Sequence, residues 1–210
     1  SIPIITHIVG TSASNVFAFT LNRQMVIYNG TKWYSTTSFN TETVSDTHVF
    51  SGNDIMAVGS DTGLSNIKRY YSQQTGDWAV AYNFGNTGSS VVFGSSDTDI
   101  WVDDTTQMIH FNGTSTTAYP LPYGILAPIL PGIATSPTDA WFYAQKNITT
   151  FVVLNWNGTS WTESFSTTLS SYHAFWANGP TDAWIGGQAG LLRHWDGTSW
   201  NLITAFTIKD

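Results

Sequence analysis

A motif that recurs five times constrains this chain more than any other feature. Each copy is a turn of the Ser/Thr-x-x-Asp kind followed by an apolar strand, and the copies read SASNVFAF, SGNDIMAV, SDTDIWV, SPTDAWFY and GPTDAWIG. The anchoring residues lie 39 to 45 positions apart and are Asn15, Asp54, Asp99, Asp139 and Asp182. A period held along the whole chain indicates one supersecondary unit repeated five times.

A second landmark follows the first in every repeat and keeps the same mean period. Its copies read YNGTKW, SQQTGDW, FNGTST, WNGTSW and WDGTSW. Asn-Gly and Asp-Gly favour tight hairpins, so the flanking aromatic residues should pair across two strands, as Trp156 with Trp161. The two landmarks together place the repeats at approximately 1–42, 43–86, 87–125, 126–168 and 169–210.

The segments between these landmarks read as short strands. In the last repeat they are YHAFWA, DAWIGG, LLRHW and SWNLITAF, each bounded by turn-forming residues. Because Gly, Thr and β-branched residues interrupt every apolar run, no segment has the spacing of an amphipathic helix. The sequence therefore predicts four antiparallel strands per repeat and almost no helix.

Four short strands in a repeat of roughly 42 residues are typical of a propeller blade. We predict an all-β fold, a five-bladed β-propeller, formed by a single domain over residues 1–210. An open solenoid is the alternative, but it needs polar capping repeats, and the first and last repeats look like ordinary members. Closure of the ring would then depend on packing between these two repeats, with Ile2 to Ile5 available as an extra edge strand.

The composition narrows the classes of partner. Only 10% of the residues are charged and the net charge is −7, so no basic surface is available for nucleic acid. No apolar run of 18 residues is present, which argues against membrane insertion. The uncharged polar residues suit an extracellular or surface-displayed protein, and the absence of cysteine excludes disulfides and thiolate sites. A start at Ser1 without a signal peptide predicts a processed or trimmed form.

The WNGTSW hairpin and the DAW strand resemble those of bacterial propeller repeats, and the five-fold count resembles the tachylectin-2-like lectins. The resemblance covers the whole chain but consists of turn and core residues, which specify a blade and not a ligand. It implies a lectin that binds amino sugars between blades. We map no ligand residue of such a lectin onto this sequence, so no binding site is carried over.

Hairpin aromatic residues are the candidates for ligand binding, since an aromatic face stacks on the apolar face of a sugar. These candidates are Tyr28, Trp33, Trp78, Trp156, Trp161, Trp195 and Trp200. Packing between blades is an equally good interpretation of them. For Trp101, Trp141 and Trp184, on the second strand of their repeats, we expect a place in the core.

Four asparagines begin an acceptor sequence for N-glycosylation, namely Asn29, Asn112, Asn147 and Asn157. Three of them fall on predicted hairpin turns, where Asn-Gly-Thr is also good turn chemistry. Asp196 holds the equivalent position in the last repeat, so the turn forms without an acceptor. Modification and turn formation therefore both remain open.

Catalysis and metal binding have little support. The five histidines lack the close spacing of a metal site, and we expect no metal and no cofactor. Glycosidases on propellers need carboxylates at specialised positions, whereas the regular acids here recur at equivalent turns and the glutamates are only Glu42 and Glu163. We therefore expect no enzyme.

The functional prediction is a non-enzymatic extracellular binding module that recognises glycans, or mediates adhesion, through repeated loops. Its partner would be a glycan, a surface protein or further copies of itself. A structural subunit of an extracellular filament, surface layer or virion surface is the alternative. A glycoside hydrolase is a more remote one.

Overall fold

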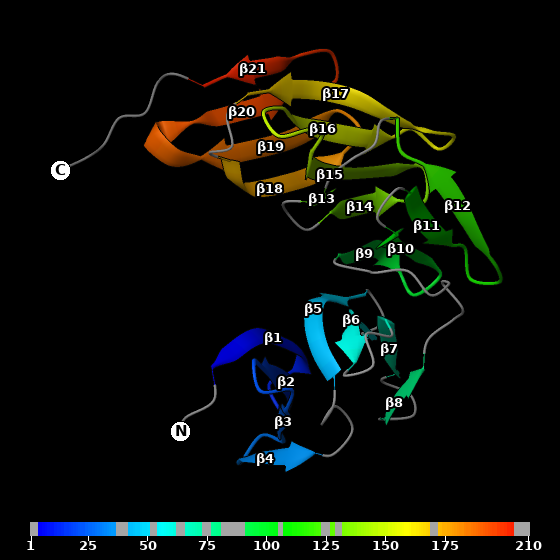
Figure 1. Cartoon of the computed structure of the whole chain (residues 1–210), viewed down its shortest axis with the longest axis vertical. Coiled ribbons are helices and arrows are strands. Elements are labelled where there is room, and N and C mark those ends of the chain that lie inside the picture. The colour runs from blue at the N-terminus through cyan, green and yellow to red at the C-terminus, as the bar shows by residue number, and fades with distance from the viewer. Residues whose placement is uncertain are drawn as a thin grey trace. The chain divides into compact units, whose positions relative to one another are not determined.

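The computed structural model describes residues 4–36, 42–50, 54–61, 66–72, 77–80, 91–104, 107–122, 127–128, 132–168 and 172–203 (Figure 1). The chain divides into two compact units, Ser1–Ala118 and Tyr119–Asp210, and each is treated by itself below.

The first unit contains three antiparallel sheets, each made of strands consecutive in the chain. The first sheet has the order β1 (Ile5–Ser12), β2 (Asn15–Thr20), β3 (Met25–Tyr28), β4 (Trp33–Thr36). The second has β5 (Glu42–Val49), β6 (Ile55–Asp61), β7 (Asn66–Ser72), β8 (Asp77–Val80). The third has β9 (Val92–Ser96), β10 (Asp99–Asp104), β11 (Gln107–Phe111) and β12 (Thr116–Pro120), the strand in which the division between the units falls.

The second unit contains the fourth and fifth sheets. The fourth has the order β15 (Asp139–Gln145), β16 (Phe151–Trp156), β17 (Trp161–Thr167), with both β13 (Ala127–Pro128) and β14 (Ile133–Ser136) paired to the free edge of β15. The fifth has β18 (Tyr172–Gly179), β19 (Asp182–Gly187), β20 (Leu192–Trp195), β21 (Trp200–Leu202). A 3₁₀ turn, η1 (Gln188–Gly190), joins β19 to β20.

The prediction of antiparallel sheets with four strands is confirmed for these residues, with one difference in the fourth sheet. Two short strands, β13 and β14, pair with β15 in place of a single first strand. The described residues include no α-helix, as expected.

The hairpin that precedes the last strand has one construction in the first, third, fourth and fifth sheets. At Asn112 the side-chain Oδ1 accepts hydrogen bonds from the amides of Thr114 and Ser115, both within 3.1 Å. Gly113 follows with a φ of +92°, a conformation that favours glycine. Because Asp196 makes the same two bonds, the structure explains why either side chain serves in this turn.

Consecutive sheets within a unit pack face to face by one positional rule. The second and fourth residues after each anchor face the following sheet, as Phe17 and Phe19 do in a core shared with Ile55 and Ala57. The first and third residues after the anchor face the preceding sheet. The same pairing occurs between the second and third sheets, through Met56, Val58, Ile100 and Val102, and between the fourth and fifth, through Trp141, Tyr143, Ala183 and Ile185.

The second residue after the anchor also meets a particular part of the next sheet, its hairpin aromatic pair. Phe17 makes edge contacts with Tyr71 and Trp78, with ring centroids 4.8 and 5.3 Å away. Trp141 contacts Trp195 and Trp200 in the same way, at 6.1 and 6.2 Å. The cores between the first and second sheets and between the fourth and fifth sheets thus each contain an aromatic residue set against two others, whereas Met56 holds this position between the second and third sheets.

Candidate functional site

The outer face of the fifth sheet is the surface that faces away from the fourth sheet. Register places Trp176 opposite Trp184 and Trp184 opposite His194, so these side chains form a row across β18, β19 and β20. A second row on this face runs through Ala174, Gly186 and Leu192. Trp176 is 51% exposed. The face therefore offers aromatic and apolar groups to a ligand or to another surface.

A triplet of polar and aromatic side chains lies at one end of this face. His194 Nε2 is 2.9 Å from Asp182 Oδ1, and Trp184 Nε1 donates to the same carboxylate at 2.9 Å. The indole of Trp184 stacks on the His194 ring, with centroids 4.1 Å apart. The hydrogen bond from His194 holds the pKa of Asp182 below its usual value, with the indole adding to the effect.

The third sheet carries the same triplet at the equivalent positions. There His110 Nε2 lies 2.5 Å from Asp99 Oδ1, and Trp101 stacks on the His110 ring at 4.2 Å. In the fourth sheet an asparagine takes the place of histidine, and Asn155 Nδ2 donates to Asp139 Oδ1 at 3.2 Å.

Sequence reasoning missed this link between the second and third strands. The sequence analysis placed these acids at turns and named no side-chain partner for them. The backbone amide of Ser95 donates to Asp99 Oδ2 at 3.3 Å, but the shorter contacts of Asp99 are with side chains. The signal was a histidine 11 or 12 residues after two of the anchors.

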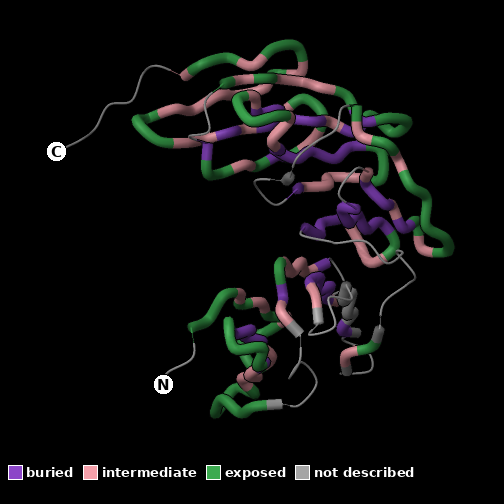
Figure 2. Tube along the Cα trace, viewed as in Figure 1, coloured by how far each residue is buried: buried purple, intermediate pink, exposed green. Residues whose placement is uncertain are grey.

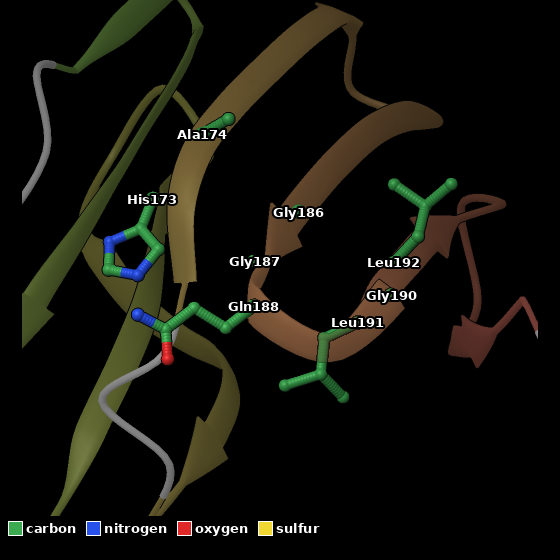
Figure 3. Close-up of a pocket in the computed structure, with 8 residues that line it drawn as sticks. All are labelled: His173, Ala174, Gly186, Gly187, Gln188, Gly190, Leu191 and Leu192. Atoms are coloured by element: carbon green, nitrogen blue, oxygen red, sulfur yellow. The ribbon is translucent and has the colours of Figure 1, made fainter.

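A pocket of about 500 Å³ opens at the other end of the outer face, beside η1 (Figure 3). Its lining is largely apolar and includes Ala174, Leu191 and Leu192 together with Gly186, Gly187 and Gly190. The side chains of His173 and Gln188 lie on one side of the pocket and the two leucines on the other. Neither His173 nor Gln188 was singled out from the sequence as a site residue, because both lie outside the repeated landmarks.

The structure places most of the predicted hairpin aromatic residues in packing positions. Trp156 and Trp161 are 2% and 3% exposed, and Trp78 packs against the core between the first two sheets. The buried rings of Trp156 and Trp161 present no free face to a sugar in this structure, whereas Trp78 is half-buried. Ligand binding by these residues stays a prediction. Trp101 and Trp141, predicted as core, are indeed buried.

The remaining candidates are more accessible. Trp195 and Trp200 are half-buried and pack against the core of the second unit, where Trp200 Nε1 donates to Ser164 Oγ at 2.9 Å. Tyr28 and Trp33 form a tilted pair with centroids 5.3 Å apart, and Trp33 is 48% exposed. Of the seven, Trp33 therefore offers the most open ring.

The four acceptor asparagines are exposed, and each caps a turn. In Asn29, Asn112 and Asn147, the side-chain oxygen also accepts from the hydroxyl of the threonine two residues later, at 2.8 to 3.1 Å. Asn157 caps its turn through the amides of Thr159 and Ser160. Exposure leaves them accessible to modification, which stays a prediction.

The other expectations concern absences. Within the described part of the chain, no three His, Asp or Glu side chains gather as metal ligands would. Glu163 is paired with Lys146 at 3.0 Å, while the side chain of Glu42 lies outside the described residues. Among the helical segments of the described residues, none has the length and apolar character needed to span a membrane.

Comparison with known proteins supplies the fold. No protein-family model and no curated protein sequence matches the chain. Solved structures do resemble it. The SapL1 lectin in complex with alpha methyl fucoside has a TM-score of 0.58 at 15% identity, over 96% of this chain and 80% of that one. A six-bladed fucose-recognising lectin of the fungus Aleuria aurantia has a TM-score of 0.53 at 16% identity, over 93% and 74%.

A third similar structure is the extracellular domain of a putative hybrid two-component system from B. thetaiotaomicron. Its TM-score is 0.62 at 12% identity, and the match covers all of this chain but 31% of that one. At such identities the likeness concerns fold alone. The similar structures include β-propeller lectins and other propeller domains.

Proposed function

We propose, proceeding from the likeness to β-propellers, that this chain is a lectin-like module that binds glycans without catalysis at an extracellular or displayed surface. In this proposal the five sheets are the blades of one five-bladed propeller over residues 1–210, with repeats of about 42 residues. We also propose that the repeats are related to the bacterial propeller repeats that the WNGTSW hairpin resembles.

The positional rule of packing supports the assignment of sheets to blades. Residues at the same distance from the anchor face the following sheet in the first, second and fourth sheets. A constant relation between neighbours is what a radial array of identical units requires. Strands consecutive in the chain form each sheet, which fits blades better than a sandwich with crossed connections.

The pocket beside η1 carries the proposal for glycan binding. A volume of about 500 Å³ lies within the range of small-ligand sites. The Gln188 amide can donate to one hydroxyl and accept from another, and the His173 imidazole can do either. Leu191, Leu192 and Ala174 would meet the apolar part of a sugar. Because this combination suits a ring with both hydroxyl and apolar faces, we take a monosaccharide unit as the ligand.

The test is a glycan array followed by titration calorimetry with alpha-methyl fucoside and with an amino sugar. We expect Gln188→Ala to weaken binding of the recognised sugar roughly tenfold, since loss of a hydrogen-bonding partner in a binding site costs about 1–3 kcal/mol. The matched control is Gln24→Ala, at an exposed glutamine in the turn between β2 and β3 of the first sheet.

If the Gln188→Ala variant and the parent protein bind the sugar with equal affinity, the binding site does not lie at the pocket beside η1. Failure of the folded protein to bind any sugar on the array would contradict the lectin proposal itself. The structural-subunit and hydrolase alternatives stay predictions, and sedimentation and a hydrolysis assay on the same samples examine them.

A further inference from the structure

The floor of the pocket beside η1 is a row of three residues on adjacent strands. Ala174 of β18 pairs with Gly186 of β19, and Gly186 pairs with Leu192 of β20. Figure 3 shows Gly186 between the other two, at the one position of the row that has no side chain. The pocket therefore lies over a point where the middle strand contributes only backbone.

Gly186 occupies a repeat position at which the other four repeats have a side chain. It is the fourth residue after its anchor, Asp182. The side chains at this position in the other repeats are all buried, and they belong to Phe19, Val58, Asp103 and Tyr143. Three of them fill an apolar core, and the carboxylate of the third sheet accepts the amide of Val91 at 2.9 Å. The fifth repeat differs from all the others by leaving this position empty.

The backbone at Gly186 does not require a glycine. Its φ is not positive, unlike that of Gly190 in the adjoining turn. A Cβ atom at Gly186 would lie 3.7 Å from Leu192 Cδ1 and 3.9 Å from Leu191 O, which are ordinary van der Waals distances. By contrast, a Cβ atom at Gly59 of β6 would come within 1.9 Å of a backbone oxygen. Neither turn geometry nor close packing therefore explains Gly186, and its effect is to leave space.

The residue paired with this position on the innermost strand is small as well. It is Ala174 in the fifth sheet, but His7 in the first sheet and Asp46 in the second. Asp46 Oδ2 accepts a hydrogen bond from the amide of Val92 at 2.9 Å. A methyl group extends much less far than a carboxylate, so Ala174 enlarges the space beside Gly186.

We infer that Gly186 is the specificity-determining residue of the pocket, and that the ligand places one apolar group where the other repeats have a side chain. The inference rests on the proposed function, because it names the part of a sugar that the site selects. Ala174, Leu191 and Leu192 bound the space with carbon atoms. A methyl group buried there leaves water favourably, whereas a hydroxyl would lose its hydrogen bonds to water. The ligand class is therefore a sugar with a methyl-bearing substituent.

The same reasoning gives one site of this kind per chain. In the first, second and fourth sheets the equivalent space is filled by Phe19, Val58 and Tyr143, each almost fully buried. A ligand cannot enter a close-packed core without displacing these side chains. The pocket should therefore bind one sugar per chain and not one for each repeat.

The test variant is Gly186→Val, which gives the fifth sheet the residue that the second has at Val58. Two pairs of probes, each differing in one substituent, are titrated by calorimetry: N-acetylglucosamine with glucose, and methyl α-L-fucoside with methyl α-L-galactoside. We expect the parent protein to prefer the methyl-bearing member of at least one pair, with one site per chain. Gly186→Val should weaken binding of that sugar roughly 10- to 100-fold, because the new side chain fills the space.

The matched control is Ser166→Val, at an exposed position of β17 in the fourth sheet. It also adds a branched side chain to a strand, but away from the pocket, and should bind the sugar as the parent does. Gly186→Ala should weaken binding less than Gly186→Val, because alanine fills less of the space.

A second readout does not depend on a sugar. Glycine weakens a strand, and the position has room for a side chain, so Gly186→Val should raise the midpoint of thermal unfolding by roughly 1–4 °C. A fall in the midpoint would overturn the inference, because the space would then already be occupied. A midpoint that rises together with lost binding distinguishes a filled pocket from a misfolded variant.

Three results of the titrations would also overturn the inference: no preference within either pair, equal affinity of Gly186→Val and the parent, or two or more sites per chain. Each of these leaves the proposed function standing if the parent binds a sugar on the array. Failure of the parent to bind any sugar contradicts the proposed function instead, and the thermal midpoint then still decides whether Gly186 leaves a vacant space.

Discussion

The third and fifth sheets contain the same Asp–His–Trp triplet in two different environments. The stacking of the tryptophan on the histidine is nearly identical, with interplanar angles of 21° and 24°. Yet the Asp99 side chain is 1% exposed, whereas that of Asp182 is 37% exposed. Strand register sets the stacking in both sheets, because the tryptophan and the histidine lie directly opposite each other on adjacent strands and the aspartate precedes the tryptophan by two residues on the same strand. Burial depends on what covers the sheet.

The difference in environment changes the electrostatics. Burial by itself raises the pKa of Asp99, but hydrogen bonds from His110 and Ser95 outweigh it and leave the pKa below its ordinary value. At Asp182 the hydrogen bond from His194 is the leading influence and burial opposes it less. Buried carboxylates depend on such partners far more than exposed ones.

The largest effect should come from the buried indole. Trp101→Ala leaves a cavity where the side chain is fully buried, so we expect a loss of about 3–5 kcal/mol in the free energy of unfolding. Urea denaturation followed by circular dichroism measures it. The control is Ile148→Ala, at an exposed position. If both variants lose equally little free energy of unfolding, burial does not distinguish the triplet of the third sheet from that of the fifth.

The next effect concerns the carboxylates and their dependence on pH. Asp99→Asn should cost about 1.5–3 kcal/mol at neutral pH, because it weakens bonds to a buried charge. The folded-state pKa of Asp99 lies below its unfolded value of 3.8. Its contribution is therefore fully present above that value and is lost as the pH falls through the folded-state pKa.

Stability curves of the parent protein, Asp99→Asn and Asp182→Asn between pH 2 and 7 test this sign. The difference between parent and Asp99→Asn should shrink as the solution becomes acidic, and Asp182→Asn should show a smaller difference throughout. If the difference in the free energy of unfolding between the parent and Asp99→Asn grows as the pH falls, the folded state does not stabilise the ionised form of Asp99.

The smallest loss of stability is expected at the hairpin turns, which the third and fifth sheets build in the same way. Asn112→Ala removes the cap that accepts the amides of Thr114 and Ser115, and we expect a loss of about 0.5–1.5 kcal/mol. Asn112→Asp should be close to neutral, since Asp196 caps the fifth sheet's hairpin with the same bonds. Thermal unfolding of the Asn112→Ala and Asn112→Asp variants measures the two losses of stability. Equal losses would argue against a capping role for the side-chain oxygen.

Residue patterns predicted much of the fold. The anchors and the Asn-Gly hairpins located the turns, because a left-handed glycine after a capping side chain is a local property of the chain. The presence of two short strands, β13 and β14, in place of one first strand of the fourth sheet was not predicted. The pocket was missed altogether, since His173 and Gln188 follow no repeat. The pairing of β18 with β19, with Tyr172 opposite Gly187, brings His173 beside η1.

By itself the sequence determined the period, the turns, the strand register and hence which side chains share a face. Only the tertiary structure decided which hairpin aromatic residues are buried. Figure 2 shows the contrast between the exposed strand β4 of the first sheet and the buried strands β15 and β16. The physical reason is that register depends on hydrogen bonds between adjacent strands, while burial depends on a neighbouring sheet. Trp161 and Trp33 stand at equivalent hairpin positions in nearly the same local sequence, and their exposure differs because of what packs around them.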